Sequence, residues 1–187
     1  EPLLGRPDAE HVLVVFFDYA CSHCRRSHKV IDEYRRRHPS RLAMIALPTP
    51  IWPGCNPHYE DIADRFRDSC QIARLALAVW RDAPEAFEGY DAFLFETIFP
   101  RGLEEAKAEA AKHIGPEAVE QAMTDPRLTR QLNRNIEAMH NADAERVPLI
   151  ALPGAAMINE PVVSAEDIER LLDRANPHDS PARSPTP

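Results

Sequence analysis

The feature that most constrains this chain is an apolar run that leads into two cysteines spaced Cys-x-x-Cys. Residues 12–17 are all apolar and three of them are valine, which is typical of a strand covered on both faces. Cys21 and Cys24 follow the run, and residues 25–37 carry a helical pattern. The sequence therefore predicts a strand, a cysteine pair and a helix in immediate succession.

This order places Cys21 at or beside the N-terminus of a helix. Unpaired backbone N–H groups and the helix dipole favour a thiolate there. His23 lies between the cysteines and, when protonated, adds a positive charge close to the Cys21 sulfur. We therefore predict that Cys21 is the attacking thiol and Cys24 the resolving thiol of a redox pair.

Two other interpretations of the cysteine pair stay open at this point. Cys21, Cys24 and His28 have part of the spacing of a zinc site, although no second Cys-x-x-Cys or His pair completes the ligand set. The competing function is thus a non-catalytic metal-binding module that uses Cys21, Cys24 and a histidine. The pair is otherwise a structural disulfide or two inert core thiols.

Length and charge bound the class of protein. A chain of 187 residues fits one domain, or one domain with a sizeable insertion. The net charge of −8 argues against nucleic acid or an anionic membrane as the partner, and no apolar run approaches the roughly 18 residues of a membrane span. The chain begins with Glu and shows no signal peptide, so we expect a processed or trimmed sequence.

The remainder of the chain reads as a second strand, a helical stretch and a closing hairpin. Residues 42–47 are a second apolar strand, which predicts a parallel pair joined through the helix. A proline-rich loop (residues 48–57) follows, and the pattern is helical from Tyr59 onward. Residues 147–152 and 155–158 read as a hairpin. Further helix starts are expected near Pro84, Gly102, Gly115, Asp125 and Ser164.

A second cysteine pair links two of these regions. Cys55 lies in the proline-rich loop and Cys70 on the apolar face of the next helix. We predict a structural disulfide, which would stabilise the fold by roughly 3 kcal/mol through loop closure. A second redox pair that relays electrons, or a free buried thiol at Cys70, are the alternatives. The even cysteine count favours an oxidising compartment such as a bacterial periplasm.

Val147 and Pro148 enter the first strand of the hairpin. Proline before a strand is often only a device of a sheet edge. The alternative is a cis-proline whose loop packs against the Cys-x-x-Cys and presents the Val147 backbone to an extended substrate. The cysteine pair upstream and the hairpin and helix downstream favour this second interpretation.

Residues 16–24, the helical stretch, Val147-Pro148 and the closing hairpin and helix together resemble the thioredoxin superfamily, DsbA-like branch, over about residues 11–174. The resemblance implies an α/β protein, a thioredoxin fold with an inserted helical domain. The expected parts are residues 11–58 (N-terminal βαβ part), 59–145 (inserted helical domain), 146–175 (C-terminal ββα part) and 176–187 (disordered tail or linker).

The resemblance also implies a function. We expect an extracytoplasmic thiol–disulfide oxidoreductase, periplasmic in a bacterium, that exchanges disulfides with protein substrates and with a membrane or soluble redox partner. Cys21 and Cys24 would be the redox pair, with His23 and the cis-proline Pro148 beside them and with Val147 and Ser22 contacting substrate. No organic cofactor is needed.

Two departures from the family leave the redox direction open. The dipeptide between the cysteines is Ser22-His23 and lacks the proline of the strongest oxidants. Val15 occupies the position where the family often has a buried acid, so proton transfer from Cys24 would need water or another group. We expect Asp18 to be solvated at the strand end. A weaker similarity is to thioredoxin-like redox-partner domains of vitamin K epoxide reductase homologues, some of which carry a segment like residues 55–57 followed by a second cysteine.

Overall fold

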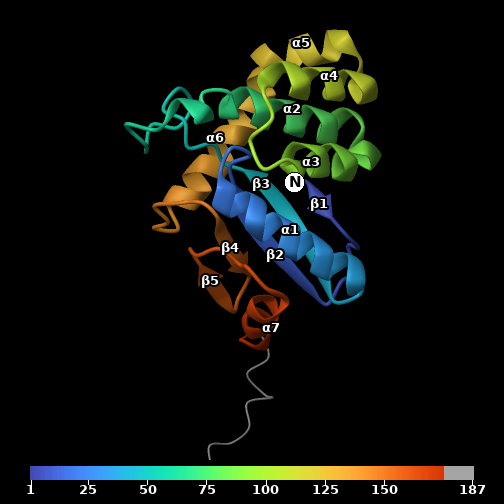
Figure 1. The fold of residues 1–187 in the computed structure, drawn as a ribbon, viewed down its shortest axis with the longest axis vertical. Coiled ribbons are helices and arrows are strands. Elements are labelled where there is room, and N and C mark those ends of the chain that lie inside the picture. The colour runs from blue at the N-terminus through green and yellow to red at the C-terminus, as the bar shows by residue number, and fades with distance from the viewer. Residues whose placement is uncertain (175–187) are drawn as a thin grey trace, which may run out of the picture.

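The apolar run at residues 12–17 forms the central strand of a five-stranded sheet (Figure 1). The computed structural model describes residues 1–174 of the chain. The strand β2 lies in the order β1-β3-β2-β4-β5, where β2 and β3 are parallel and the other pairs are antiparallel. The strands are β1 (Leu3–Leu4), β2 (His11–Phe17), β3 (Leu42–Pro48), β4 (Leu149–Leu152) and β5 (Ala156–Ile158).

Helix α1 (Ser22–Arg37) connects β2 to β3, so the predicted strand–helix–strand unit is confirmed. Helix α7 (Ala165–Asp173) follows β5 and lies against α1. The Tyr34 hydroxyl of α1 donates to the Glu169 carboxylate of α7 at 2.5 Å. Ser164 caps α7, as its place before two early acidic residues predicts.

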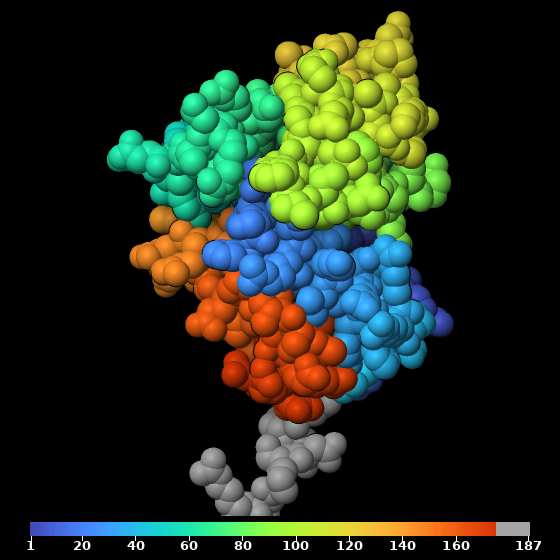
Figure 2. Space-filling view, viewed as in Figure 1, coloured from blue at the N-terminus to red at the C-terminus, as the bar shows by residue number. Residues whose placement is uncertain are grey.

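Five helices are inserted between β3 and β4, as the sequence pattern predicts. Helices α2 to α5 gather at one end of the sheet, and α6 leads back toward β4 (Figure 1). Figure 2 shows this insert meeting the rest of the molecule across its middle. The inserted helices are α2 (Ser69–Asp82), α3 (Phe87–Glu96), α4 (Leu103–Ile114), α5 (Pro116–Thr124) and α6 (Pro126–His140).

A buried aromatic cluster attaches the insert to the elements that carry the cysteines. Phe95 of α3 lies 5.3 Å from Phe17 of β2 and stacks on His28 of α1 at 4.2 Å between ring centroids. Asp91, one turn earlier on α3, accepts hydrogen bonds from Tyr19 at 2.7 Å and His28 at 2.5 Å. The insert is therefore fixed to α1 through packing and through buried polar contacts.

Two local features differ from the sequence analysis. Leu3 and Leu4, where no strand was predicted, pair with β3 as the short strand β1. The helical pattern from Tyr59 is not followed, because Asp61 adopts a positive φ of 53° and the Tyr59 hydroxyl donates to the Glu145 carbonyl. Only a 3₁₀ turn, Asp64–Phe66, precedes α2.

The predicted tail at residues 176–187 lies outside the described residues. Among residues 1–174, no helix is long and apolar enough to cross a membrane.

Candidate active site

Cys21 is the N-cap residue of α1, as the sequence predicts. Its backbone is extended, with φ −80° and ψ 120°, and its sulfur accepts a hydrogen bond from the Cys24 N–H at 3.4 Å. Cys21 is 8% exposed and Cys24 is 1% exposed, and the two sulfurs are not bonded to each other. Cys21 is therefore the more accessible thiol of the pair.

The surroundings of the pair separate the acidities of the two thiols. Hydrogen bonding from the Cys24 thiol and the N–H groups of Cys24 and His23 lowers the pKa of Cys21 to about 7, against the opposing effect of burial. Burial raises the pKa of Cys24 well above its ordinary value. At neutral pH a large share of Cys21 is thus thiolate, while Cys24 keeps its proton.

His23 contributes to the site through its backbone. It stabilises the Cys21 thiolate through its backbone N–H, while its side chain lies exposed next to the exposed Ser22 at the start of α1. Among the described residues, the His23 imidazole makes no hydrogen bond that would fix it over the sulfur.

The loop before β4 reaches Cys21 from the far end of the sequence. The Val147–Pro148 peptide bond is cis. The Cys21 thiol donates to the Val147 carbonyl at 3.8 Å. Asn159, just after β5, donates to the Pro148 carbonyl at 3.0 Å and also to the Arg146 carbonyl. Asn159 therefore braces both sides of the loop, a role that its sequence position does not reveal.

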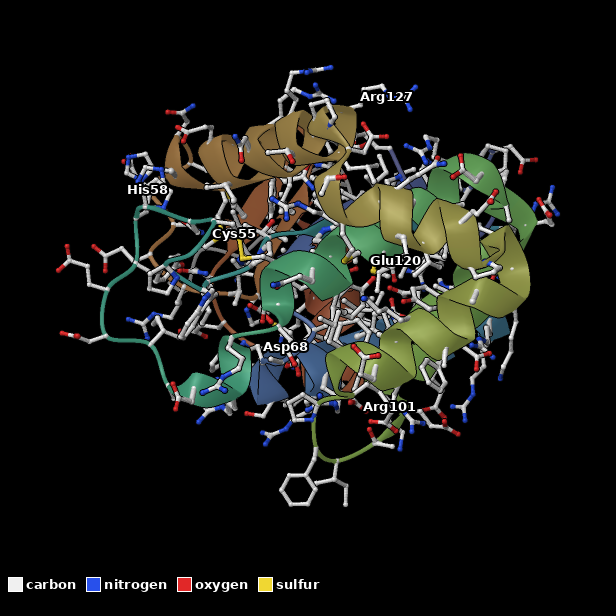
Figure 3. The ribbon with its side chains drawn as sticks, turned by 90° about the horizontal axis from the view of Figure 1, so that it is seen from above. Cys55, His58, Asp68, Arg101, Glu120 and Arg127 are labelled. Atoms are coloured by element: carbon white, nitrogen blue, oxygen red, sulfur yellow. A yellow bond between two sulfur atoms is a disulfide. The ribbon has the colours of Figure 1, made fainter. Side chains whose placement is uncertain are left out.

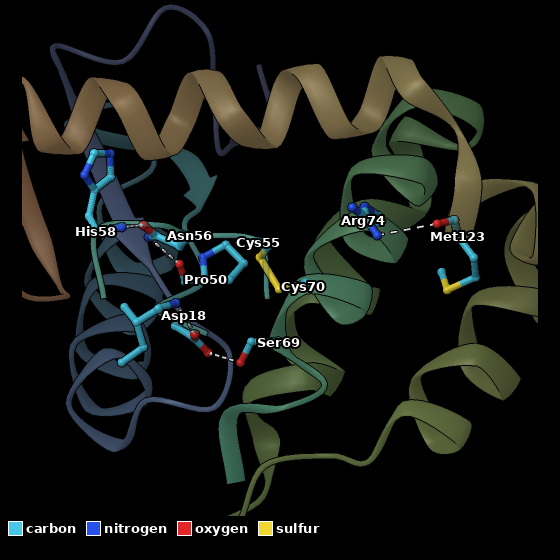
Figure 4. The surroundings of a disulfide bond; sticks show 10 residues. Asp18, Pro50, Cys55, Asn56, His58, Ser69, Cys70, Arg74 and Met123 are labelled. Carbon is cyan, nitrogen blue, oxygen red and sulfur yellow. Dashed lines mark hydrogen bonds between the residues drawn. A yellow bond between two sulfur atoms is a disulfide. The ribbon is translucent and has the colours of Figure 1, made fainter. Parts of the chain in front are cut away.

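Asp18 corrects the expectation of a solvated side chain. It is 2% exposed, and its carboxylate accepts hydrogen bonds from Ala20 N–H at 2.7 Å, Ile51 N–H at 2.9 Å and the Ser69 hydroxyl at 2.8 Å (Figure 4). Burial outweighs these bonds and raises the pKa of Asp18 to about 6. Asp18 directly follows the last residue of β2 and lies three residues before Cys21, the N-cap residue of α1.

Asp18 also lies against the cysteines. Its backbone N–H stabilises the Cys24 thiolate, and its negative charge raises the pKa of both Cys21 and Cys24. Val15, at the position where the acid was expected, is an apolar core residue that is 3% exposed. The buried acid of this site therefore stands three residues before Cys21 instead of six.

Solved structures with similar architecture identify the fold. The catalytic domain of Proteus mirabilis ScsC superposes with a TM-score of 0.72 at 22% identity, over 92% of this chain and 86% of that one. BdbD from Bacillus subtilis superposes with a TM-score of 0.70 at 16% identity, over 94% and 93% of the two chains. This chain has a DsbA-like thioredoxin fold.

Two further comparisons agree with this fold, and a third adds nothing to it. A family model described as Thioredoxin matches residues 1–39, which hold β2 and the Cys-x-x-Cys. A thioredoxin-like oxidoreductase from Silicibacter pomeroyi superposes with a TM-score of 0.73 at 20% identity, over 94% of this chain and 91% of that one. No curated protein matches the sequence. The α/β thioredoxin fold that the resemblance implied is confirmed.

The second cysteine pair of this thioredoxin fold is joined. Cys55 and Cys70 form a disulfide that ties the proline-rich loop to the first turn of α2 (Figure 3). Their Cα atoms lie 6.1 Å apart. Cys70 is therefore not a free buried thiol.

Cys21, Cys24 and His28 do not come together as metal ligands. His28 points its Nε2 at Asp91, 2.5 Å away, on the side of the insert. Within residues 1–174, no three His, Cys, Asp or Glu side chains are placed to hold a metal ion together.

A cavity opens beside the loop that precedes Pro148. It has a volume of about 480 Å³, and Glu145 and Tyr59 line it. The Tyr59 hydroxyl donates to the Glu145 carbonyl at 3.0 Å, and burial together with the charges of Cys24 and Asp18 raises the pKa of Tyr59 to about 12. The cavity thus borders the segment that reaches Cys21. Its other lining residues are Asn56, His58, Glu60, Ile136, Met139, His140, Asp143 and Ala144.

Proposed function

We propose that this protein is a thiol–disulfide oxidoreductase that exchanges disulfides with protein substrates through Cys21 and Cys24. The observation that carries the proposal is the environment of Cys21. Its sulfur sits at the start of α1, where it accepts the Cys24 N–H, and it touches the Val147 carbonyl. A thiolate held next to a backbone carbonyl of the cis-proline loop can meet a cysteine in an extended chain.

The thiol pair supports a balanced exchange reaction. The Cys21 thiolate attacks one sulfur of a substrate disulfide, forms a mixed disulfide and expels the other substrate sulfur as thiolate. Cys24 then loses its proton, attacks the Cys21 sulfur and releases the second substrate thiolate. The Cys21–Cys24 disulfide forms, and two electrons pass to the substrate. The reverse sequence oxidises a dithiol substrate.

Cys24 needs a proton acceptor, because burial raises its pKa. We assign this role to Asp18, whose backbone contacts Cys24 and whose carboxyl has a pKa of about 6. A carboxyl with a pKa near neutrality can take up a proton and release it again at the pH of the reaction.

The acidity of Cys21 favours the reducing direction. Its pKa of about 7 is that of a thioredoxin-like thiol, whereas the strongest oxidants have a first cysteine with a pKa near 3.5. Less stabilisation of the thiolate means a weaker oxidant. A reduced thiol partner would then regenerate the pair.

An extracytoplasmic location fits this proposal. The Cys55–Cys70 disulfide is of a kind that persists in oxidising compartments. A periplasmic thioredoxin-like protein from Salmonella enterica shares the fold with a TM-score of 0.70 at 19% identity, over 92% of this chain and 87% of that one.

The test is the reduction potential of the pair. Protein is equilibrated in glutathione buffers, free thiols are alkylated, and Cys21 and Cys24 are quantified by mass spectrometry. We expect a two-electron transition closer to about −270 mV than to about −120 mV, and a Cys21→Ser variant without exchange activity on a disulfide-bonded protein. A pair that stays reduced in every buffer would overturn the proposed function.

A further inference from the structure

The hydrogen bonds of Asp18 come from three separate elements. Ala20 is local, whereas Ile51 belongs to the proline-rich loop and Ser69 is the first residue of α2. Ile51 N–H donates to Oδ2, and the Ser69 hydroxyl and Ala20 N–H both donate to Oδ1. Two of the three bonds therefore depend on elements distant in sequence.

Only one of these partners can serve both protonation states of the carboxyl. The N–H groups of Ala20 and Ile51 can only donate, so they satisfy an ionised carboxylate. The Ser69 hydroxyl donates to the carboxylate and, after rotation, accepts the proton of the carboxylic acid. Ser69 is 3% exposed, so water does not replace it freely. Asp18 can thus gain or lose a proton at Oδ1 and keep a hydrogen bond with Ser69 in both states.

The Cys55–Cys70 disulfide joins the two elements that supply the distant bonds. Cys70 follows Ser69 directly at the start of α2. Cys55 lies four residues after Ile51, and the intervening loop is closed by Asn56, whose amide donates to the Pro50 carbonyl at 2.7 Å. Figure 4 shows the disulfide, Ser69 and Asp18 side by side. Removing the disulfide removes the covalent link between the proline-rich loop and the start of α2.

We infer that Ser69 is a positioning residue for proton exchange at Asp18, and that the Cys55–Cys70 disulfide holds Ser69 and Ile51 in register on the carboxyl. The role of the disulfide is thus to tune the reactive pair, in addition to closing a loop. This inference rests on the proposed function only in so far as Asp18 serves Cys24 during exchange.

Few titratable groups face Asp18, which makes its titration readable. From α1 these groups are Cys21 and Cys24, and from the segment after the proline-rich loop the group is Tyr59. From α2 the facing group is the neutral Ser69. Within residues 1–174, no Lys, Arg or His forms an ion pair with Asp18.

The first measurement is the titration of Asp18 itself, which requires no activity. The carboxyl shift of isotope-labelled aspartate is followed by NMR against pH, with Asp18→Asn to assign the signal. Wild type should titrate near pH 6. Ser69→Ala and the double variant Cys55→Ala/Cys70→Ala should each move this titration upward by roughly one pKa unit, the size of one hydrogen bond to a charged group.

Two variants control for general disturbance. Thr49→Val removes another buried hydroxyl, which donates to the Leu47 carbonyl and not to Asp18, so it should leave the titration where it was. Ser69→Thr keeps the hydroxyl and should restore the wild-type value. An Asp18 titration that is the same in wild type, S69A and the disulfide variant overturns the inference.

The second measurement separates tuning through Asp18 from loss of structure. The rate at which Cys24 resolves a mixed disulfide on Cys21 is recorded against pH, by release of a chromophoric thiol in single turnover. Removing the disulfide should shift this profile in wild type and leave it unmoved in the D18N background. Equal shifts in both backgrounds would count against the inference. If wild type exchanges no disulfide while the NMR shifts hold, the proposed function fails and the positioning of Asp18 stands.

Discussion

The Cys21 thiolate is stabilised by backbone and thiol donors at the start of α1, whereas Cys24 is enclosed. We therefore predict that iodoacetamide modifies Cys21 with a pH dependence centred near 7 and that Cys24 stays unmodified until the protein unfolds. The measurement is the rate of mass gain between about pH 5 and 9. A centre near 9 for native wild type would contradict the assignment, and C21S should lose the fast phase.

Asp18 should also make stability depend on pH. Its pKa is raised from 3.8 to about 6 in the folded protein. Between these values the folded state binds a proton that the unfolded chain has released, so the unfolding free energy falls as pH rises. This stabilisation is fully present below pH 3.8, the pKa of Asp18 in the unfolded chain, and is lost as the pH rises through about 6. In full it amounts to about 3 kcal/mol.

The comparison of wild type with D18N isolates this contribution. Urea unfolding at several pH values should show the difference in unfolding free energy between the two proteins changing by about 2.4 kcal/mol from about pH 4 to 7. The amide that D18N introduces leaves one buried N–H donor unpaired. This lowers the unfolding free energy of D18N by the same amount at every pH, so it does not change the pH dependence. A pH-independent difference would show that Asp18 is ionised throughout.

At the residue scale the sequence identified Cys21 and Cys24 but misplaced Asp18. A Cys-x-x-Cys between a strand and a helix is a local signal, and its chemistry follows from spacing. The burial of Asp18 depends instead on Ile51 and Ser69, which lie 33 and 51 residues further along the chain. No local pattern encodes such a meeting, and Asn159 was missed for the same reason.

At the scale of elements, starts and stops were predictable wherever a single residue type sets them. Asp125 caps α6 with its side chain, and Gly115 adopts the positive φ of 81° that ends α4. The prediction of a helix from Tyr59 was wrong. The apolar spacing of this segment is helical, but Tyr59 bonds to Glu145, which is distant in sequence. In this region the Tyr59–Glu145 hydrogen bond and the Cys55–Cys70 disulfide hold the chain in a non-helical conformation.

The junction between α1 and α3 gives a prediction at this scale. Asp91 is 1% exposed and satisfies both Tyr19 and His28. Asp91→Ala leaves these two buried groups without their acceptor, so we expect a loss of about 3 kcal/mol in unfolding free energy. Urea unfolding measures it. Glu96→Ala on the same helix removes an exposed partner of Arg101 and should cost less than about 1 kcal/mol; similar losses in both variants would contradict the structural role of Asp91.

At the scale of the whole molecule, the active site joins segments that are far apart in sequence. Cys21 and Val147 are separated by 126 residues, and their contact was predicted from the order of the cysteine pair, the hairpin and the closing helix together with the family resemblance. The pattern of strands and helices was enough to predict a helical insert within a sheet protein. It did not predict how the insert is seated, because that depends on the packing of Phe95 and Asp91 against α1.

The loop between α3 and α4 lies beside the site and carries two exposed apolar side chains. Ile98 is 85% and Phe99 80% exposed. Arg25 of α1 donates to the Ile98 carbonyl at 3.2 Å and to the Tyr19 carbonyl at 3.1 Å, so the loop is anchored next to the turn that leads into Cys21. A depression of about 230 Å³ lies between this loop and the turn before Cys21, and Pro100 and Ala20 line it.

We therefore expect these side chains to contact the apolar segments of an unfolded protein substrate. Ile98→Ser/Phe99→Ser should raise KM for a disulfide-bonded unfolded protein by about tenfold, the effect of losing partial burial of two apolar side chains. Exchange with a small disulfide and the thermal midpoint should not change. Val163→Ser, which alters a half-exposed residue just before α7, is the matched control. An unchanged KM in the double variant would mean that substrates approach Cys21 without touching this loop.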